Sequence, residues 1–385
     1  MNQASGPLSG FRLIEIAGIG PTQLTGMLLA DMGADIIRVD RPAAVDLGIA
    51  MPEQFNLMNR SRPSVAIDLK NPQGVETVLT LCEKADALFE GFRPGVMERL
   101  GLGPDSCMQR NPALVYGRMT GWGQDGPLAE TAGHDPNYIG IAGAFSLIGE
   151  AGGPPVYPLN LVGDFRGGGA YLAMGLLAAL LETSKSGKGQ VVDSAMVDGV
   201  ASMLTYFYGL KAAGLWKQER GSNILDGGSH FAHPYKTRDD QYIVIAALEG
   251  RFYQELLDRL GIDDPELRDE QMKQKRWPEF QQKLEKVFAS KTRDEWCELL
   301  EGTDTCFSPV LSLDEAAQHP HAKARNTYVD VEGITQPAPT PRFSRTPGRV
   351  QSPPPETGQD TITALKAWGL SEAEIKTLQE DKAIA

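Results

Sequence analysis

Short apolar segments alternate with longer amphipathic segments along the first 125 residues. Between the apolar runs, residues 22–32 and 72–84 have the length and composition of helices. Strands that alternate with helices predict βαβ units and a mainly parallel sheet, so we expect an α/β fold. The apolar or β-branched runs that we expect to be strands are 11–17, 35–40, 64–68, 87–91 and 114–120.

The pattern changes after residue 120. Residues 121–169 are dense in glycine and proline, which predicts an ordered loop region with few long elements, of a kind that often carries function. Residues 189–193 favour a further strand, and 196–216 have helical length. A second α/β region is expected to begin at 242–248, with charged helices near 251–260 and 276–301. The proline-rich stretch 337–355 predicts an extended connector before a helical tail near 360–380.

Composition and charge narrow the possible partners. A chain of 385 residues with a net charge of −13 does not present the positive field that holds nucleic acids or acidic membranes. A small anionic ligand held by a few local arginines remains compatible with this charge. Residues 1–7 lack the pattern of a targeting leader, and no apolar run is long enough to span a bilayer. The four cysteines show no disulfide framework, so we expect a cytoplasmic protein: Cys82, Cys107, Cys297 and Cys306.

Two potential proton carriers, His134 and Asp164, have glycine- and proline-rich neighbours. An imidazole exchanges a proton near neutral pH, and a carboxylate shares that work if its environment tunes its pKa. Asp164 also suits the cap of a helix beginning near residues 166–170, where backbone N–H groups would stabilise a nearby oxyanion. If the fold brings the two side chains together, they predict an enzyme that moves a proton across a carbon centre.

Four basic residues follow predicted strands or the loops after them: Arg41, Lys70, Arg93 and Arg99. The carboxyl ends of parallel strands meet at one edge of a sheet, where ligands bind. Cations gathered there would hold phosphates through charge-assisted hydrogen bonds, whereas each of them alone would be an ordinary surface charge.

Two other patterns predict weaker alternatives. Gly18-Ile-Gly20 follows a strand and Asp40 ends the next one, but Gln23 stands where the dinucleotide fingerprint requires a third glycine. His230-x-x-His233 and His319-Pro-His321 lack the accompanying ligands of a zinc site. We therefore expect neither a nicotinamide cofactor nor a metal.

Ordered motifs along nearly the whole chain resemble the family III CoA-transferase superfamily, and within it the branch of racemases that act on 2-methylacyl-CoA thioesters. The similar segments run from Pro7-Leu-Ser-Gly to Pro341-Arg-Phe-Ser-Arg-Thr. The sequence departs from the family pattern at His230 and His233, where aromatic and acidic residues are more usual. The other similar segments are Ala34-Asp-Ile-Ile-Arg-Val-Asp-Arg-Pro, Glu90-Gly-Phe-Arg-Pro-Gly-Val, Arg99-Leu-Gly-Leu-Gly-Pro, Met119-Thr-Gly-Trp-Gly-Gln-Asp-Gly-Pro, Ala132-Gly-His-Asp, Leu161-Val-Gly-Asp and Leu225-Asp-Gly-Gly.

The resemblance implies a fold and an assembly. It implies a large Rossmann-like CoA-binding domain at 1–198, a linker at 199–224 and a small α/β domain at 225–325. Residues 326–385 would be a second linker and a C-terminal segment that returns to the large domain. Two chains would interlock as a homodimer, with the active site between the large domain of one chain and the small domain of the other.

The resemblance also implies residue roles. His134 and Asp164 would be the acid/base pair, and Glu249 would orient His134 or stabilise its charge. CoA would be part of the substrate, and no separate cofactor would be required. The implied contacts with the CoA moiety are Arg41, Ile67, Asp68, Leu69, Lys70, Gly91, Phe92, Arg93, Arg99, Gly133, His134, Asp135, Pro136, Asn137 and Tyr138.

The implied reaction is the interconversion of (2R)- and (2S)-2-methylacyl-CoA by proton transfer through an enolate, whose oxygen would meet backbone N–H groups near Asp164. One alternative is a CoA-transferase of the same fold, with Asp164 as the nucleophile that forms a mixed anhydride. A CoA-binding protein without catalysis is another. Branched fatty, sterol side-chain and aryl-propionyl groups all remain open as the acyl group.

Overall fold

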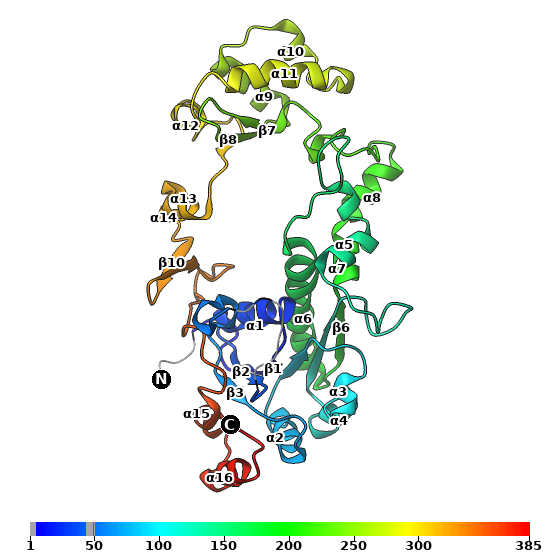
Figure 1. Ribbon diagram of the computed structural model, residues 1–385, viewed down its shortest axis with the longest axis vertical. Helices are drawn as coiled ribbons and strands as arrows, with labels where there is room; N and C mark the ends of the chain where they lie inside the picture. Colours follow the sequence, from blue (N-terminus) through cyan, green and yellow to red (C-terminus); the bar gives the residue numbers. More distant parts are fainter. Residues whose placement is uncertain (1–4, 44–48, 50) are drawn as a thin grey trace. The chain divides into compact units, whose positions relative to one another are not determined.

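Six parallel strands form the main sheet of the protein (Figure 1). The computed structural model describes residues 5–43, 49 and 51–385. The strand order is β3-β2-β1-β4-β5-β6, and every neighbouring pair is parallel. The predicted α/β class and the predicted strands are confirmed. The strands are β1 (Arg12–Ile16), β2 (Asp35–Asp40), β3 (Ser64–Ala66), β4 (Ala87–Glu90), β5 (Val115–Thr120) and β6 (Val191–Ala195).

Helices cover both faces of this sheet (Figure 1). One face packs against α1 (Pro21–Asp31), α6 (Tyr171–Ser186) and α7 (Met196–Met203) through a core that includes Leu29, Leu172 and Leu176. The opposite core joins the sheet to α2 (Pro72–Cys82), α4 (Pro104–Arg110), α15 (Thr361–Ala367) and α16 (Glu372–Glu380). The strands are mostly apolar on both faces because both are covered, with a few buried charged residues such as Glu15 and Arg38. The remaining short elements of this part are α3 (Val96–Arg99), α5 (Asp135–Ala142), η1 (Glu53–Phe55), η2 (Leu57–Asn59), β10 (Tyr328–Val331) and β11 (Ile334–Pro337).

The order of the strands reverses at β1. From β1 the chain moves outward to β2 and β3, and it then returns to β4 on the other side of β1. Leu13 pairs with Ala87, so the carboxyl ends of β1 and β4 are neighbours. Such a switch point opens a crevice at the carboxyl edge of the sheet, where ligands bind in folds of this kind.

The glycine-rich region holds more helix than its sequence predicts. A π-helical segment, η4 (Leu161–Ala170), leads directly into α6. The helical backbone therefore begins at Leu161, before the start expected near residues 166–170, whereas its α-helical part begins at Tyr171. The helix persists despite its glycines because they allow close packing. A Cβ on Gly168 would lie 2.8 Å from Met196 Cγ and 3.0 Å from Pro21 Cβ.

The C-terminal residues close the free edge of β3. Ser64 N–H donates to Asp360 Oδ2, and Ala66 N–H donates to Thr361 Oγ1. Ile67 forms an antiparallel bridge with Ile384, and Asp68 N–H donates to the carbonyl of Ala383. The C-terminal segment is thus part of the same compact unit as the sheet, which comprises residues 1–142, 159–203 and 324–385.

A second compact unit comprises residues 143–158 and 204–323. Its antiparallel sheet has the order β7-β8-β9, and its core gathers Phe231, Tyr253, Trp277, Phe280 and Trp296. Within the described ranges no helix is long and apolar enough to cross a membrane. The elements of this unit and of the segment that follows it are η3 (Phe145–Leu147), α8 (Thr205–Ala212), η5 (Ile224–Asp226), β7 (Ala232–Lys236), β8 (Tyr242–Ala246), α9 (Gly250–Leu260), α10 (Pro265–Asp269), η6 (Gln274–Arg276), α11 (Trp277–Phe288), α12 (Arg293–Leu300), β9 (Phe307–Pro309), α13 (Leu313–Gln318) and α14 (Pro320–Ala324).

Candidate active site

The turn after β1 and the loop after β4 meet at the start of α1. A Cβ on Gly18 would lie 2.7 Å from Thr22 Oγ1, and a Cβ on Gly91 would lie 2.8 Å from Thr22 Cγ2. Thr22 is buried and lies in the first turn of α1. Both loops therefore close around one side chain at the switch point of the sheet.

His134 directly precedes α5 and is exposed. Its carbonyl accepts hydrogen bonds from the N–H groups of Asn137 and Tyr138, and its own N–H donates to Asn137 Oδ1 at 3.0 Å. These three bonds fix the main chain of His134 at the first turn of the helix. The imidazole remains open to a ligand.

Asp164 is half-buried within η4, and two neighbours confine its carboxylate. Asn160 Nδ2 donates to Asp164 Oδ2 at 3.3 Å. On another side, a Cβ on Gly20 would lie 3.3 Å from the same oxygen. Gly20 has φ 59° and ψ −106°, a conformation open to glycine alone, so the backbone of the turn borders the carboxylate directly.

Asp135 connects the segment of His134 to that of Asp164. The buried Asp135 Oδ2 accepts from the N–H groups of Gly163 and Asp164, each at 2.7 Å. The backbone segments of His134 and Asp164 are therefore joined: His134 directly precedes Asp135, and Asp164 donates its N–H to the Asp135 carboxylate. The N–H of Phe165 donates to the carbonyl of Asn160.

These bonds correct two expectations. The N–H groups of Gly163, Asp164 and Phe165 already have acceptors, so they do not stand ready for an enolate oxygen. Asp164 lies inside the helix rather than at its cap, because η4 begins at Leu161. The carboxylate of Asp135 accepts the N–H groups of Gly163 and Asp164, and the carbonyl of Asn160 accepts that of Phe165.

The pKa of the Asp164 carboxyl is raised above its usual value, chiefly by burial. The hydrogen bond from Asn160 lowers this pKa, the charge of Asp135 raises it, and the charge of His134 lowers it. Burial likewise raises the pKa of Asp135, against the two N–H groups that it accepts. A carboxyl group with a raised pKa is better suited to donate as well as accept a proton near neutral pH.

Tyr138 holds the backbone next to His134. Its buried hydroxyl donates to the carbonyl of Gly133, and its ring packs edge-on against Trp122 with centroids 4.8 Å apart. The pKa of Tyr138 is raised to about 12, chiefly by burial, with the charge of Asp164 also raising it and the charge of Arg93 lowering it. Arg93 and Asp164 therefore both lie within electrostatic reach of this tyrosine.

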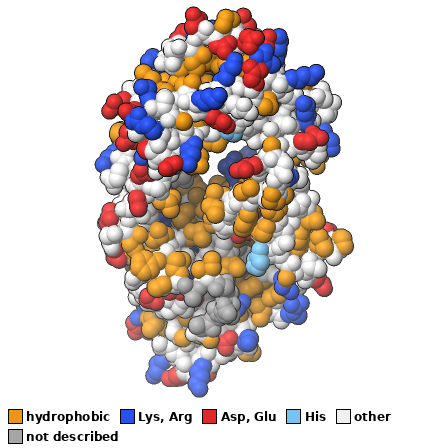
Figure 2. Space-filling view, turned by 45° about the horizontal axis from the view of Figure 1, so that its top comes forward, with side chains coloured by type: hydrophobic (Ala, Val, Ile, Leu, Met, Phe, Trp, Pro, Cys, Tyr) orange, Lys and Arg blue, Asp and Glu red, His pale blue; other side chains and the backbone are white. Residues whose placement is uncertain are grey.

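Three of the four predicted phosphate ligands gather around the loop after β4. The guanidinium of Arg41 lies 5.4 Å from the ring centre of Phe92. Arg93 follows Phe92, and Arg99 Nη1 would lie 3.1 Å from a Cβ on Gly95. Arg41, Arg93 and Arg99 are all exposed. Lysine and arginine side chains are dispersed among acidic ones on the surface (Figure 2), so the net charge of −13 does not prevent a local cationic site.

The predicted CoA-binding segments divide by exposure. Lys70 is exposed, its N–H donates to Asp68 Oδ1, and Leu69 packs against the core at half-burial. Gly91 and Asn137 are exposed, and Gly133 and Pro136 are half-buried. The side chains of Ile67, Asp135 and Tyr138 are buried, so the predicted contact of these three with CoA would be made by their backbone.

Glu249 and the histidine pairs lie in the second unit. Glu249 is exposed and precedes α9, where its carbonyl accepts from the N–H groups of Phe252 and Tyr253. Its assigned partnership with His134 stays a prediction. His230 is buried with Nε2 2.8 Å from Tyr253 Oη, and burial lowers its pKa to about 4. In the part of the chain that the structure describes, no three His, Cys, Asp or Glu side chains form a group that could hold a metal.

Asn160 and the internal role of Asp135 escaped prediction from the sequence. Asn160 stands four residues before Asp164, a spacing that places two side chains on one helical face, but the sequence predicts no helix there. Asp135 follows His134 directly, and its partners lie 28 and 29 residues away. Neither interaction has a local sequence signal.

Comparison with known proteins shows the class to which this fold belongs. Residues 8–361 match CoA-transferase family III, and the chain belongs to this family. It is 42% identical to the alpha-methylacyl-CoA racemase of Mus musculus and 39% identical to that of Homo sapiens, in each case over 98% of this chain and 97% of the relative. The solved structure of Rv3272 from Mycobacterium tuberculosis is 30% identical, with a TM-score of 0.78 over 94% of this chain and 99% of that one. Rv3272 carries the name probable fatty acyl-CoA transferase. The predicted family and fold are confirmed.

Proposed function

We propose that the protein is a racemase of 2-methylacyl-CoA thioesters, with His134 and Asp164 as its acid/base pair. The observation that carries the proposal is the Asp135 carboxylate, which joins the segment of His134 to the N–H groups of Gly163 and Asp164. The raised pKa of the Asp164 carboxyl and the electrostatic effect of His134 on it support this pairing. The names of the mouse and human relatives support the same activity.

The reaction follows from the chemistry of a thioester. The carbonyl acidifies the neighbouring C–H, and one base removes that proton to give an enolate. The conjugate acid of the other group then returns a proton to the opposite face, so the carbon is inverted with no net loss of atoms. Two chemically different groups suit this exchange because His134 and Asp164 each act as base for one enantiomer and as acid for the other.

The CoA moiety is the anionic part of the substrate. We propose that Arg41, Arg93 and Arg99 bind its phosphates, because their guanidinium groups are exposed around one loop at the carboxyl edge of the sheet. Lys70, which follows β3 at the same edge, would add a further cation. The thioester itself supplies the activation, so the reaction as proposed requires no separate cofactor.

The assembly is the finer part of the proposal and rests on the family resemblance. We infer a homodimer in which Glu249 serves the His134 of the other chain. Co-expressing His134→Ala with Glu249→Ala tests this, because a mixed dimer would hold one intact site and regain activity. If both variants are inactive alone and the isolated mixed dimer is also inactive, the shared site is refuted.

The activity is tested in deuterium oxide with one enantiomer of a 2-methylacyl-CoA and no acceptor acid. We expect deuterium at the α-carbon, measured by mass spectrometry, and loss of optical purity, measured by chiral chromatography. Branched fatty, sterol side-chain and aryl-propionyl thioesters form the substrate panel. Retained hydrogen and retained handedness with all three would refute the proposal. Acyl exchange that appears only when a carboxylic acid is added would instead show a CoA-transferase, with Asp164 as nucleophile.

A further inference from the structure

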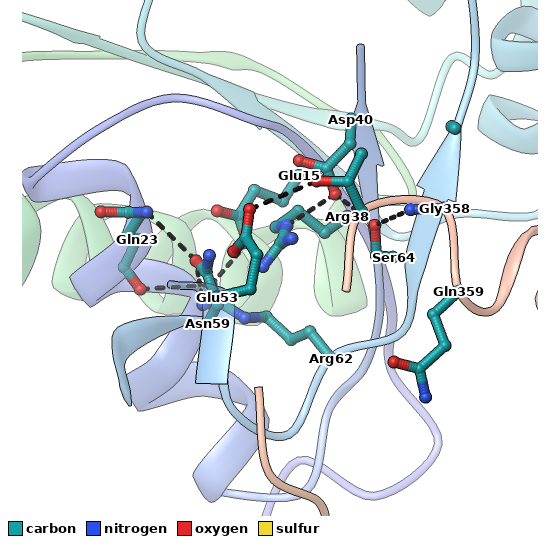
Figure 3. A network of polar contacts seen from close by, with 12 residues as sticks. Glu15, Gln23, Arg38, Asp40, Glu53, Asn59, Arg62, Ser64, Gly358 and Gln359 are labelled. Carbon is teal, nitrogen blue, oxygen red and sulfur yellow. Dashed lines mark hydrogen bonds and ion pairs between the residues drawn. The ribbon is translucent and has the colours of Figure 1, made fainter. Parts of the chain in front are cut away.

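A chain of polar side chains lies beneath the turn that borders Asp164, and the proposed reaction does not use it. Glu15, Gln23, Asn59 and Arg62 interact there, as Figure 3 shows. Glu15 comes from β1, Gln23 from α1 and Asn59 from η2, so three elements converge on one network. Its position makes it a candidate support for the site.

Both polar atoms of the Gln23 side-chain amide form hydrogen bonds. Its Oε1 accepts from the N–H of Gly20 at 3.1 Å, and its Nε2 donates to Asn59 Oδ1 at 3.1 Å. Its backbone carbonyl accepts from Arg62 Nη1, also at 3.1 Å. Gln23 is therefore a brace that ties the Gly18–Gly20 turn to the layer below it.

The lower end of this brace is held by a fully buried ion pair. Arg62 Nη1 donates to Glu15 Oε2 at 2.5 Å, and both side chains are 0% exposed. Arg62 also donates to the carbonyl of Met58 and, at 3.5 Å, to Asn59 Oδ1. A Cβ on Gly26 would lie 1.8 Å from Arg62 Nη1, so α1 carries a glycine where the guanidinium passes.

Such a pair is costly to bury, and apolar residues of similar volume often stabilise a core as well or better. Charged groups in a core have their best-attested use in fixing one arrangement among several. Here the arrangement they fix is that of Gln23 and, through it, of Gly20. A Cβ on Gly20 would lie 3.3 Å from Asp164 Oδ2, so a shift of the turn would change the backbone surface that borders this carboxylate.

We propose that Gln23 is a positioning residue for Asp164: it holds the Gly18–Gly20 turn against the carboxylate, and Asn59, Arg62 and Glu15 hold Gln23. This inference rests on the proposed function, in which Asp164 is one of the two proton carriers. Gln23 stands where the dinucleotide fingerprint requires glycine. Gln23, which argues against a nucleotide-binding turn, thus has a proposed structural role.

The test replaces Gln23 with methionine, which is close in volume but removes both side-chain hydrogen bonds. We expect kcat for racemisation to fall about tenfold, which corresponds to about 1.4 kcal/mol, with KM for the thioester changed less than about twofold. Gln359→Met is the matched control. Gln359 Oε1 accepts from the N–H of Glu356, three residues earlier, in an exposed turn, and we expect the kcat of Gln359→Met to stay at the wild-type value.

A second readout separates positioning from general damage. Each enantiomer presents its α-proton to only one of the two carriers, so exchange in deuterium oxide is measured for each enantiomer separately at short times. We expect Gln23→Met to slow the initial exchange of the enantiomer that faces Asp164, while the other exchanges within about twofold of wild type. Equal slowing of both, or a kcat equal to that of Gln359→Met, would overturn the proposal.

Asn59 gives an independent variant should Gln23→Met fail to fold. Asn59→Asp keeps an oxygen acceptor for Gln23 and Arg62, and we expect near wild-type kcat. Asn59→Leu removes it and should reproduce the enantiomer-specific loss. Equal activity of the two Asn59 variants would also overturn the inference. Failure of the proposed function is a different result: the wild-type protein would then racemise no thioester in the panel.

Discussion

Removing the carboxylate of Asp135 should strongly reduce kcat, although this side chain is buried and is not proposed to react with the substrate. Asp135 Oδ2 accepts two N–H groups at 2.7 Å and is 1% exposed. A hydrogen bond to a charged group contributes about 1.5–3 kcal/mol, so Asp135→Ala removes about 3–6 kcal/mol of local interaction. Asp135→Asn keeps an oxygen acceptor at about 0.5–1.5 kcal/mol for each neutral bond. We therefore expect kcat in the order wild type, Asn, Ala, with losses of about tenfold and at least about a hundredfold.

The pH profile gives a second and more specific expectation. The charge of Asp135 raises the pKa of Asp164, so its removal in Asp135→Asn should lower that pKa. The acid limb of the kcat/KM profile should then move to lower pH. The assay is racemisation of a 2-methylacyl-CoA across a pH series, with unfolding curves for each variant.

Asp105→Asn is the matched control for this pair. Asp105 is an exposed carboxylate in the first turn of α4, as Asp135 is a buried one in the first turn of α5. We expect its rate and its acid limb to equal those of the wild type. The reasoning is refuted if Asp135→Ala and Asp135→Asn both keep kcat within about twofold and leave the acid limb in place.

Two further substitutions test the site, and a third tests the effect of a buried carboxyl on stability. His134→Ala should abolish racemisation while leaving CoA affinity nearly intact by calorimetry, and an equal loss of binding would show a structural histidine instead. Asn160→Ala should raise the pKa of Asp164, because the amide donates to its carboxylate, and so move the acid limb to higher pH; a limb that stays or falls contradicts this. The pKa of Glu90 is raised from 4.5 to about 7, chiefly by burial. Ionisation of Glu90 therefore destabilises the native state, and this destabilisation is absent at low pH and grows as the pH rises towards 7. Glu90→Gln removes this cost, and its unfolding free energy relative to wild type should rise by about 2–3 kcal/mol between about pH 5 and about pH 8 in denaturant curves; no change with pH would contradict it.

The sheet could be predicted from the sequence because each strand has a local signature. The apolar runs and the helices between them determine βαβ units, and the basic residues after the strands then fall at one edge without further information. The predicted Arg41, Arg93 and Arg99 do lie around one loop. The pairing of His134 with Asp164 needed the family resemblance, since nothing local connects them.

The helix at Leu161 could not be predicted because its stability is tertiary. Gly163, Gly167, Gly168 and Gly169 lower its intrinsic propensity, and close contacts with α1 and α7 compensate. The hydrogen bonds of Gln23 could not be predicted for a related reason. The network around Gln23 involves β1, η2 and the segment after η2, which are distant in sequence. One local signal is present: Glu15 lies between Ile14 and Ile16 in a predicted strand, and a buried carboxylate requires a partner.

The hydrogen bonds along β3 have a consequence for solubility. An edge strand with free N–H and C=O groups is a template on which another chain can add a strand, and proteins commonly block such edges with charges or proline. Here Asp360, Thr361, Ala383 and Ala385 occupy the groups of residues 64–68. The C-terminal segment thus acts as a built-in guard against edge-to-edge aggregation of the sheet.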